Sequence, residues 1–396
     1  MCALLGLGIA GAIINVCSIG PANAIIAKAS VRTFADFEAV PPIHTLASSG
    51  ATALPEGMTP TQVKTAYLLP ATGGSGIIAI VGAYEHPAIE SDLAVFDKQF
   101  KLAACTVANK CLTVHDMKAT TNGVGEMPKN AGWDLESALD TEWAHAIAPK
   151  AKILVVESAS TKGADLMKAV DYARAQPGVV SVSMSWGGSE FSDETTLDGH
   201  FSATGTGGLN SSTSNIAFFA SSGDDGTGAS WPAASPYVIG VGGTSLTMTN
   251  VGTTAKFASE KAWSGSGGGV SAYETEPSYQ KTYSIARAGG KRAIPDVSFA
   301  ADPQRGFSVY HNGWYVIGGT SAGAPQWAAL ATLGMSGKKK YPISLAELYK
   351  DKSSGVYAIY FRDITTGTNG ACGYYCGARS HYDYVTGLGS PITDHF

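Results

Sequence analysis

Charged residues are scarce in this chain of 396 residues, and basic residues form no run longer than the three lysines 338–340. Charged side chains make up 15% of the sequence, and the formal net charge is −5 at pH 7. Without a basic patch the chain lacks the electrostatic footprint of a nucleic-acid-binding protein, so nucleic acid is excluded as an expected partner. The 48 glycines and the 44% hydrophobic content instead predict a folded, loop-rich globular protein.

No apolar run is long enough to span a membrane. Residues 3–16 are almost wholly apolar, but a run of this length suits the h-region of a signal peptide, and Ala22-Asn23-Ala24 fits a cleavage site. We therefore predict that residues 1–24 are a signal peptide, which makes the mature protein secreted or periplasmic and free of the membrane. The alternative is a buried N-terminal segment. Residues 25–57 are interpreted as a linker or residual pro-segment, and 58–396 as the folded domain.

Cysteine is also scarce, and its positions fit an exported protein. Two of the six cysteines would leave with the signal peptide, and the other four form two close pairs, Cys105/Cys111 and Cys372/Cys376. In an oxidising compartment such pairs predict two local disulfides. A metal site is the weaker alternative, because no Cys-x-x-Cys or nearby histidine spacing supports it.

Phosphate-binding loops are absent from the sequence. The glycine-rich stretches 73–76, 205–208 and 265–269 lack both Gly-Lys-Ser/Thr and the G-x-G-x-x-G spacing between a strand and a helix. We interpret them as turns and substrate-facing loops.

Strands and helices alternate along the chain. Continuous apolar runs, typical of strands buried on both faces, lie at 77–81, 152–156, 179–184 and 216–220. Helices are predicted from Pro60 and over 88–100, 134–147, 164–175, 193–203 and 322–333. This order predicts an α/β fold with a doubly wound, mostly parallel sheet and helices on both faces, in which active sites gather beyond the carboxyl ends of the strands.

Ser321 is the candidate nucleophile. It follows Gly318-Gly319-Thr320 and opens a predicted helix, whose first turn tolerates Pro325. A helix N-terminus favours negative charge, which a serine needs if it is to generate an oxyanion beside itself. An ordinary helix cap remains the alternative.

Three carboxyls are candidate partners of this serine. Glu136 and Asp140 lie one turn apart on the predicted helix 134–147, for which Asp134 is the expected N-cap. In a cleft such a pair can share one proton, and on a surface it is an ordinary solvated face. Asp224 ends the strand 216–220 and is either an Asx-turn residue or a protonated donor to an oxyanion.

The motifs around these residues resemble the sedolisin family of serine carboxyl peptidases, which have a subtilisin-like fold. The resemblance covers roughly 58–396. It rests on Glu136-x-x-Leu139-Asp140, Ser183-Met184-Ser185-Trp186-Gly187, Ser222-Gly223-Asp224, Trp231-Pro232-Ala233-Ala234-Ser235-Pro236, Gly267-Gly268-Gly269-Val270-Ser271, Pro295-Asp296-Val297-Ser298, Gly318-Gly319-Thr320-Ser321-Ala322 and Thr386-Gly387-Leu388-Gly389-Ser390-Pro391.

The resemblance implies a role for each of these groups. Ser321 is the expected nucleophile, Glu136 its base, Asp140 the partner of that base and Asp224 the oxyanion donor. The expected substrate-binding residues are Ser185, Trp186 and Gly187 on one side and Gly267, Gly268 and Gly269 on the other. One Ca²⁺ is expected on Asp363, Ile364, Arg379, His381 and Asp383, although relatives often carry glycine where Arg379 and His381 stand.

The sequence thus predicts a secreted, acid-acting serine endopeptidase that cleaves protein or peptide substrates and is expected to be a monomer. A carboxylate base suits acid, and no histidine here has the His-Gly-Thr context of an ordinary subtilisin. A tripeptidyl-peptidase of the same family is the nearest alternative. A catalytically silent secreted binding protein on this fold is the alternative of another class.

Overall fold

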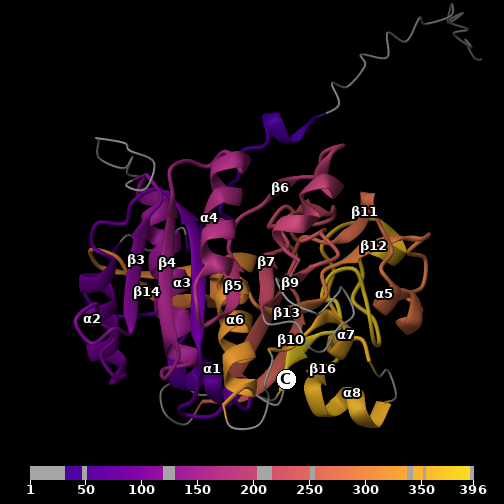
Figure 1. Cartoon of the computed structure of the whole chain (residues 1–396). Coiled ribbons are helices and arrows are strands. Elements are labelled where there is room, and N and C mark those ends of the chain that lie inside the picture. The colour runs from indigo at the N-terminus through magenta and orange to yellow at the C-terminus, as the bar shows by residue number, and fades with distance from the viewer. Residues whose placement is uncertain are drawn as a thin grey trace, which may run out of the picture. The chain divides into compact units, whose positions relative to one another are not determined.

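The computed structural model describes residues 32–46, 51–118, 130–202, 216–249, 255–336, 342–350 and 354–392, and the fold below refers to these residues (Figure 1). The predicted signal peptide, residues 1–24, lies outside them. Residues from Arg32 onward form one compact unit, so residues 32–46 belong to the same unit as the predicted folded domain. Within the described ranges, no helix combines the length and the apolar character needed to cross a membrane.

The main sheet has eight strands and is mostly parallel. Seven of them run in the order β10-β9-β7-β5-β2-β4-β3, and β13 pairs in parallel with β9. Only the edge strand β10 is antiparallel to its neighbour. The strands are β2 (Ile77–Ala83), β3 (Leu112–Asp116), β4 (Lys152–Ser158), β5 (Val179–Met184), β7 (Ala217–Ser221), β9 (Val238–Thr249), β10 (Lys256–Ala262) and β13 (Val297–Ala300).

Short strands form four smaller sheets, β1-β15-β14, β11-β12, β16-β17 and β6-β8. Their bounds are β1 (His44–Thr45), β6 (Gly188–Ser189), β8 (Ser230–Trp231), β11 (Gly269–Thr275), β12 (Lys291–Ile294), β14 (Phe307–Tyr310), β15 (Trp314–Gly318), β16 (Phe361–Arg362) and β17 (Ser390–Pro391).

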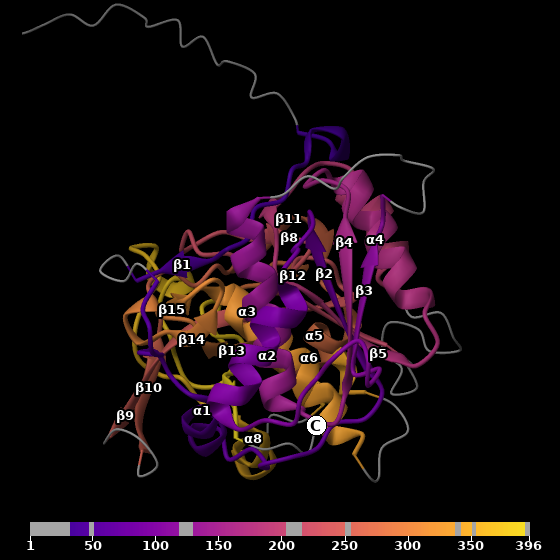
Figure 2. The ribbon, with the colours of Figure 1, turned by 90° about the vertical axis from the view of Figure 1, so that its left-hand side faces the viewer.

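Helices cover both faces of the main sheet. They are α1 (Pro60–Ala66), α2 (Ile89–Phe100), α3 (Ala131–Ile147), α4 (Gly163–Ala175), α5 (Ser278–Tyr283), α6 (Gly323–Gly334), α7 (Leu345–Leu348) and α8 (Ser354–Tyr360), with 3₁₀ turns η1 (Phe34–Asp36), η3 (Glu194–His200), η5 (Pro303–Arg305), η6 (Thr320–Ala322) and η7 (Gly373–Tyr375). Figure 2 shows α2 and α3 on one side of β2 and β4, and α4 on the other. Helix α6 packs on α3 and on β5 and β7, and so lies on the same side as α3.

Each face of the sheet has its own hydrophobic core. In β2, Ile78 and Ile80 belong to the core under α3 and α6, whereas Ala79 and Val81 belong to the core under α4. Successive side chains of a strand point to opposite faces, so burial on both faces requires the continuous apolar run that the sequence shows. The fold class predicted from these runs is confirmed.

Local sequence explains where several helices begin. Thr59 and Gln62 form a capping box at the start of α1, with Pro60 in its first turn. Helix α3 begins a turn earlier than predicted, because Asn130 rather than Asp134 is its N-cap and accepts the amides of the first turn. Both predicted disulfides are present, Cys105–Cys111 and Cys372–Cys376.

Candidate active site

Ser321 lies in the turn that joins β15 to α6. Gly319 begins this turn with φ of 116°, a conformation that favours glycine. Ser321 follows in η6 and is fully buried, and its hydroxyl oxygen lies 3.5 Å from the carbonyl oxygen of Ser185. Pro325 falls in the first turn of α6, where a missing amide removes no helical hydrogen bond. The serine therefore stands just before the N-terminus of α6.

Helix α3 brings Glu136 and Asp140 to this turn. Both side chains are buried, and α3 packs against η6 and α6. The hydroxyl of Ser321 and the carboxyl of Asp140 lie near enough to change the pKa of Glu136. Yet no group in the described part of the chain has hydrogen-bond geometry with either Glu136 oxygen. The base position thus holds a buried carboxyl whose oxygens remain available to a ligand or to the serine.

Ser185 connects Asp140 to the nucleophile. Its hydroxyl oxygen lies 2.7 Å from Oδ1 of Asp140 and 3.2 Å from the carbonyl oxygen of Ser321. Since a hydroxyl has one hydrogen, Ser185 donates to only one of these two oxygens at a time, and the Asp140 oxygen is the nearer. This link fixes the distance between α3 and the serine turn.

Burial governs the charge of the carboxyl pair. The pKa of Glu136 is well above its ordinary value, because the side chain is removed from water and, to a smaller extent, because Asp140 lies beside it. Burial also raises the pKa of Asp140, while the Ser185 hydroxyl acts in the opposite direction. Two neighbouring carboxyls that are both buried cannot both be charged without a large cost, so these shifts favour at least one proton on the pair.

Asp224 is held against the same turn from the end of β7. Its Oδ1 accepts hydrogen bonds from the Thr320 amide at 2.8 Å and from the Thr320 hydroxyl at 2.7 Å. Its Oδ2 lies at ion-pair distance, 3.1 Å, from Nε2 of His44. Burial raises the pKa of Asp224, although His44 and Thr320 lower it. The structure thus brings Ser321, both carboxyls of α3 and Asp224 together.

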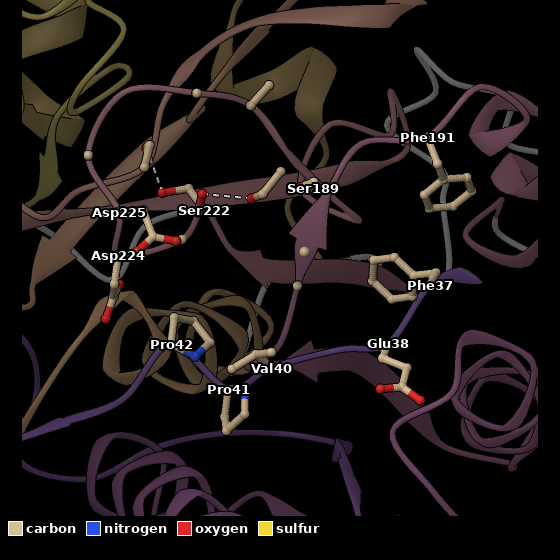
Figure 3. Close-up of a pocket in the computed structure, with 18 of the residues that line it drawn as sticks. Phe37, Glu38, Val40, Pro41, Pro42, Ser189, Phe191, Ser222, Asp224 and Asp225 are labelled. Atoms are coloured by element: carbon tan, nitrogen blue, oxygen red, sulfur yellow. Dashed lines mark hydrogen bonds between the residues drawn. The ribbon is translucent and has the colours of Figure 1, made fainter. Parts of the chain in front are cut away.

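Ten residues between Arg32 and His44 form part of the wall of a cavity beside Asp224 (Figure 3). This cavity has a volume of about 580 Å³, and its walls include Gly187, the loop 222–230 and Gly267. Figure 3 shows Val40, Pro41 and Pro42 grouped together, with Asp224 on the side of Pro42. The sequence placed these residues in a linker or residual pro-segment and gave no sign of this position.

The three residues of the predicted substrate-binding stretch 185–187 have different surroundings, and only Gly187 lines the cavity. Gly187 lines the cavity and exchanges two backbone hydrogen bonds with Val40, at 3.0 and 3.2 Å. The side chain of Trp186 is fully buried, and its indole nitrogen donates to the Val81 carbonyl, so it packs in the core below. Ser185 faces Asp140, as described above.

The three predicted glycines opposite Gly187 also differ in position. Gly267 lines the cavity, and a side chain there would collide with the Ser222 carbonyl, so glycine lets this loop approach the backbone of Ser222 and Gly223. Gly268 accepts a hydrogen bond from the Gly228 amide, and Gly269 begins β11. Neither of these two is part of the cavity wall.

Two groups at the site were missed by the sequence reasoning. His44 lies far from the motifs along the chain and reaches Asp224 only because β1 pairs with β15. Thr320 stands inside the Gly-Gly-Thr-Ser stretch, and its two hydrogen bonds orient Asp224. The motif itself was a signal for Thr320, whereas for His44 the sequence offered none.

The residues expected to hold calcium do come together near the C-terminus. Both carboxylate oxygens of Asp363 lie 3.0 Å from the His381 amide nitrogen. Oδ2 of Asp383 accepts from the Arg379 amide and the Thr386 hydroxyl, and Oδ1 accepts from two further amides. His381 has φ of 63°, a conformation that favours glycine.

This arrangement does not fit the expected calcium site. A calcium ion takes six to eight oxygen ligands, but here N–H and O–H donors already face all four carboxylate oxygens. The expected ligands Ile364, Arg379 and His381 would act through carbonyls, whereas amides of Arg379 and His381 point at the carboxylates. The sequence-based expectation of an ion is therefore not matched by the donor set.

We expect chelation to leave the melting temperature unchanged, because hydrogen bonds rather than an ion close this segment. The measurement is thermal unfolding with chelator and with added Ca²⁺, in a Ser321→Ala background that prevents self-digestion. Asp383→Asn should lower the free energy of unfolding by about 1–3 kcal/mol, the cost of disrupting hydrogen bonds to a buried charged group. If added Ca²⁺ raises the melting temperature of the Ser321→Ala protein, this expectation is wrong and the calcium site predicted from the sequence is supported.

Comparison with known proteins places the chain in a family. The model of the subtilase family matches residues 128–354. Kumamolisin of Bacillus sp. (strain MN-32) is 32% identical over 375 residues, which cover 86% of this chain and 63% of that protein. Sedolisin of Pseudomonas sp. (strain 101) is 29% identical over 286 residues, 65% of this chain and 47% of the relative. The chain thus spans less than two thirds of each of these relatives.

A solved structure shares the fold. Pseudomonas sedolisin, described as a serine-carboxyl proteinase complexed with two molecules of pseudo-iodotyrostatin, superposes with a TM-score of 0.70 at 24% identity, over 86% of this chain and 96% of that one. The family match covers more than half of the chain, and sedolisin itself is among the relatives found both by sequence and by structure. The chain therefore belongs to the subtilase family and, within it, to the sedolisins.

Proposed function

We propose that this protein is a serine peptidase that hydrolyses peptide bonds in protein or peptide substrates. The observation that carries the proposal is a peptide carbonyl already seated at the candidate nucleophile: the Pro42 oxygen lies 3.4 Å from the Ser321 amide nitrogen. That chain is also paired with Gly187 as an added strand, which is how an extended substrate binds a protein edge. The site therefore has both a place for substrate and groups that can react with it.

In this proposal the chain's own residues supply every step. Glu136 accepts the proton of the Ser321 hydroxyl as its oxygen attacks the substrate carbonyl carbon, and later donates a proton to the leaving amine. Asp140, which accepts a hydrogen bond from Ser185, orients Glu136 and shares a proton with it. The Ser321 amide and the protonated carboxyl of Asp224 donate to the oxyanion. Water then hydrolyses the acyl-serine by the same groups in reverse order.

The cleft favours an endopeptidase over a tripeptidyl-peptidase. Eight residues between Arg32 and Pro42 line the cavity and reach the seated carbonyl from its N-terminal side, which is more than three. A substrate that followed the same path would have more than three residues on the N-terminal side of the bond that is cleaved. Export is part of the proposal and is supported by the two disulfides, which persist in oxidising compartments. No calcium ion enters the mechanism.

Ser321→Ala should abolish peptide hydrolysis and leave the fold intact, because a small hydroxyl contributes little to packing. Asp224→Asn should lower kcat by about 10²–10³, the usual loss for one oxyanion donor. Both are measured with a peptide library and with circular dichroism as a check of folding. Normal turnover by Ser321→Ala would refute the assignment of Ser321 as the nucleophile. If the wild-type protein is folded but cleaves no peptide in the library, the chain is instead a catalytically silent binding protein.

The rate of hydrolysis should fall on the alkaline side of its pH profile. Burial raises the pKa of Glu136, Asp140 and Asp224, so each keeps a proton to higher pH than an exposed carboxyl. As pH rises through these values, the shared proton and the donor proton of Asp224 are lost, and the charged Asp224 repels the oxyanion. The test is kcat measured from pH 2 to pH 8, and a rate that still climbs toward pH 8 would contradict the proposal.

A further inference from the structure

We propose that Cys105, Cys111 and His145 form a Zn²⁺ site when the Cys105–Cys111 disulfide is reduced, so that this part of the fold is closed either by a disulfide or by an ion. One nitrogen of the His145 ring and the two sulfurs lie within 4.8 Å of one another. Thiolate sulfur and imidazole nitrogen are the ligands that Zn²⁺ prefers. The inference does not depend on the proposed function, because none of the three residues lines the cavity beside Asp224.

The histidine of this site comes from a distant part of the chain. His145 lies in the last turn of α3, whereas the two cysteines lie in the segment between α2 and β3. Helix α2 packs on α3, and this packing brings the segment that follows α2 to the end of α3. The spacing of the cysteines along the sequence therefore could not reveal the third ligand.

The ring of His145 is arranged as that of a metal ligand. Its Nε2 lies 2.8 Å from the carbonyl oxygen of Ala103 and 3.4 Å from Oδ1 of Asp97. Because a carbonyl oxygen can only accept, the neutral ring carries its hydrogen on Nε2 and keeps a lone pair on Nδ1. The side chain is only 1% exposed, yet Nδ1 has no hydrogen-bond partner in the described part of the chain. A histidine that binds a metal through one nitrogen usually donates from the other in this way.

The two cysteines are placed so that both sulfurs can reach one ion. Their Cα atoms are 4.9 Å apart. Two sulfurs on a tetrahedral Zn²⁺ lie about 3.8 Å apart, since each Zn–S bond is about 2.3 Å long. Cys105 is buried, whereas Cys111 is half-buried and follows the exposed residues 107–110. Rotation of the Cys111 side chain therefore gives the sulfurs this separation and gives an ion a path to them.

The two states of the site are linked by a balanced exchange. Cysteines are thiols when a chain is synthesised, and two thiols release two protons when they bind Zn²⁺ as thiolates. A small-molecule disulfide, such as oxidised glutathione, then oxidises the pair by thiol–disulfide exchange. The S–S bond of the oxidant breaks, its two sulfurs take up two electrons and two protons, the Cys105–Cys111 bond forms and Zn²⁺ is released.

A second group of possible ligands lacks the arrangement of His145. His86, Asp92 and His311 also lie within 4.8 Å of one another. However, Nδ1 of His86 accepts the Ala88 amide at 3.2 Å, so the neutral ring carries its hydrogen on Nε2, which lies 3.5 Å from Asp92. The His86 nitrogen that faces Asp92 therefore has no lone pair for an ion, and we propose no metal there.

The test is titration of the reduced protein with Co²⁺, a spectroscopic substitute for Zn²⁺, in the Ser321→Ala background, which prevents self-digestion. A phosphine reduces the disulfides and is itself oxidised to the phosphine oxide, while water supplies the oxygen and the two thiol hydrogens. We expect a thiolate-to-cobalt charge-transfer band in the near ultraviolet and the strong visible bands of a tetrahedral ion. One equivalent of Zn²⁺ should remove both. Circular dichroism in the near ultraviolet reports whether the protein remains folded.

Three variants separate this site from others. Cys105→Ser/Cys111→Ser should abolish the charge-transfer band. The matched control is Cys372→Ser/Cys376→Ser, which should leave the band unchanged, because among the described residues no histidine or carboxylate forms a comparable group with that pair. His145→Gln should raise the Kd of Zn²⁺ by more than about 100-fold, the upper end of the loss that follows removal of an outer partner of a ligand.

The inference is overturned if the charge-transfer band survives Cys105→Ser/Cys111→Ser, or if folded His145→Gln binds Zn²⁺ as tightly as its parent. Equal binding by the oxidised protein would place the ion at another site and would also overturn it. So would loss of the folded state on reduction in the presence of Zn²⁺. If His145→Gln does not fold, Cys111→Ser at its half-buried position replaces it, and an unchanged Kd of that variant would contradict the inference.

Discussion

The site depends on keeping two carboxyls out of water next to a serine. Glu136 and Asp140 are each 2% exposed, and a charge buried to this extent is costly unless it is paired or protonated. A proton on the pair removes most of this cost, and Asp140 accepts a hydrogen bond from Ser185. The packing of α3 on α6 and η6, which holds the carboxyls beside Ser321, is therefore the constraint on which the site's chemistry depends.

Much of this could be predicted from the sequence, because periodicity and burial are local signals. The apolar runs of β2, β4, β5 and β7 predicted a doubly wound sheet, and the turn before α6 predicted the position of Ser321. The N-cap of α3 was predicted one turn too late. Asp134 and Asn130 are both good capping residues, and only the course of the preceding chain decides between them.

Contacts between distant parts of the chain could not be predicted. His44 and Asp224 are 180 residues apart, and the Pro41-Pro42 stretch has the composition of a linker. Its place in the cleft follows from strand pairing with β15 and from aromatic packing at Phe37, neither of which is visible in a local pattern. Near the C-terminus, the sequence indicated that Asp363 and Asp383 come together. It did not reveal the direction of the surrounding amides, because that direction depends on the backbone conformation.

The proposed function requires that Ser321 form a bond with substrate, and this is the claim to test most directly. An acid-quenched reaction with a peptide ester, analysed by mass spectrometry after digestion, traps any acyl group on the enzyme. We predict an adduct of the acyl mass on the peptide that contains Ser321, and none when Glu136→Gln replaces the wild type. Turnover of the ester with no adduct on Ser321, or with the adduct on another residue, would contradict the account.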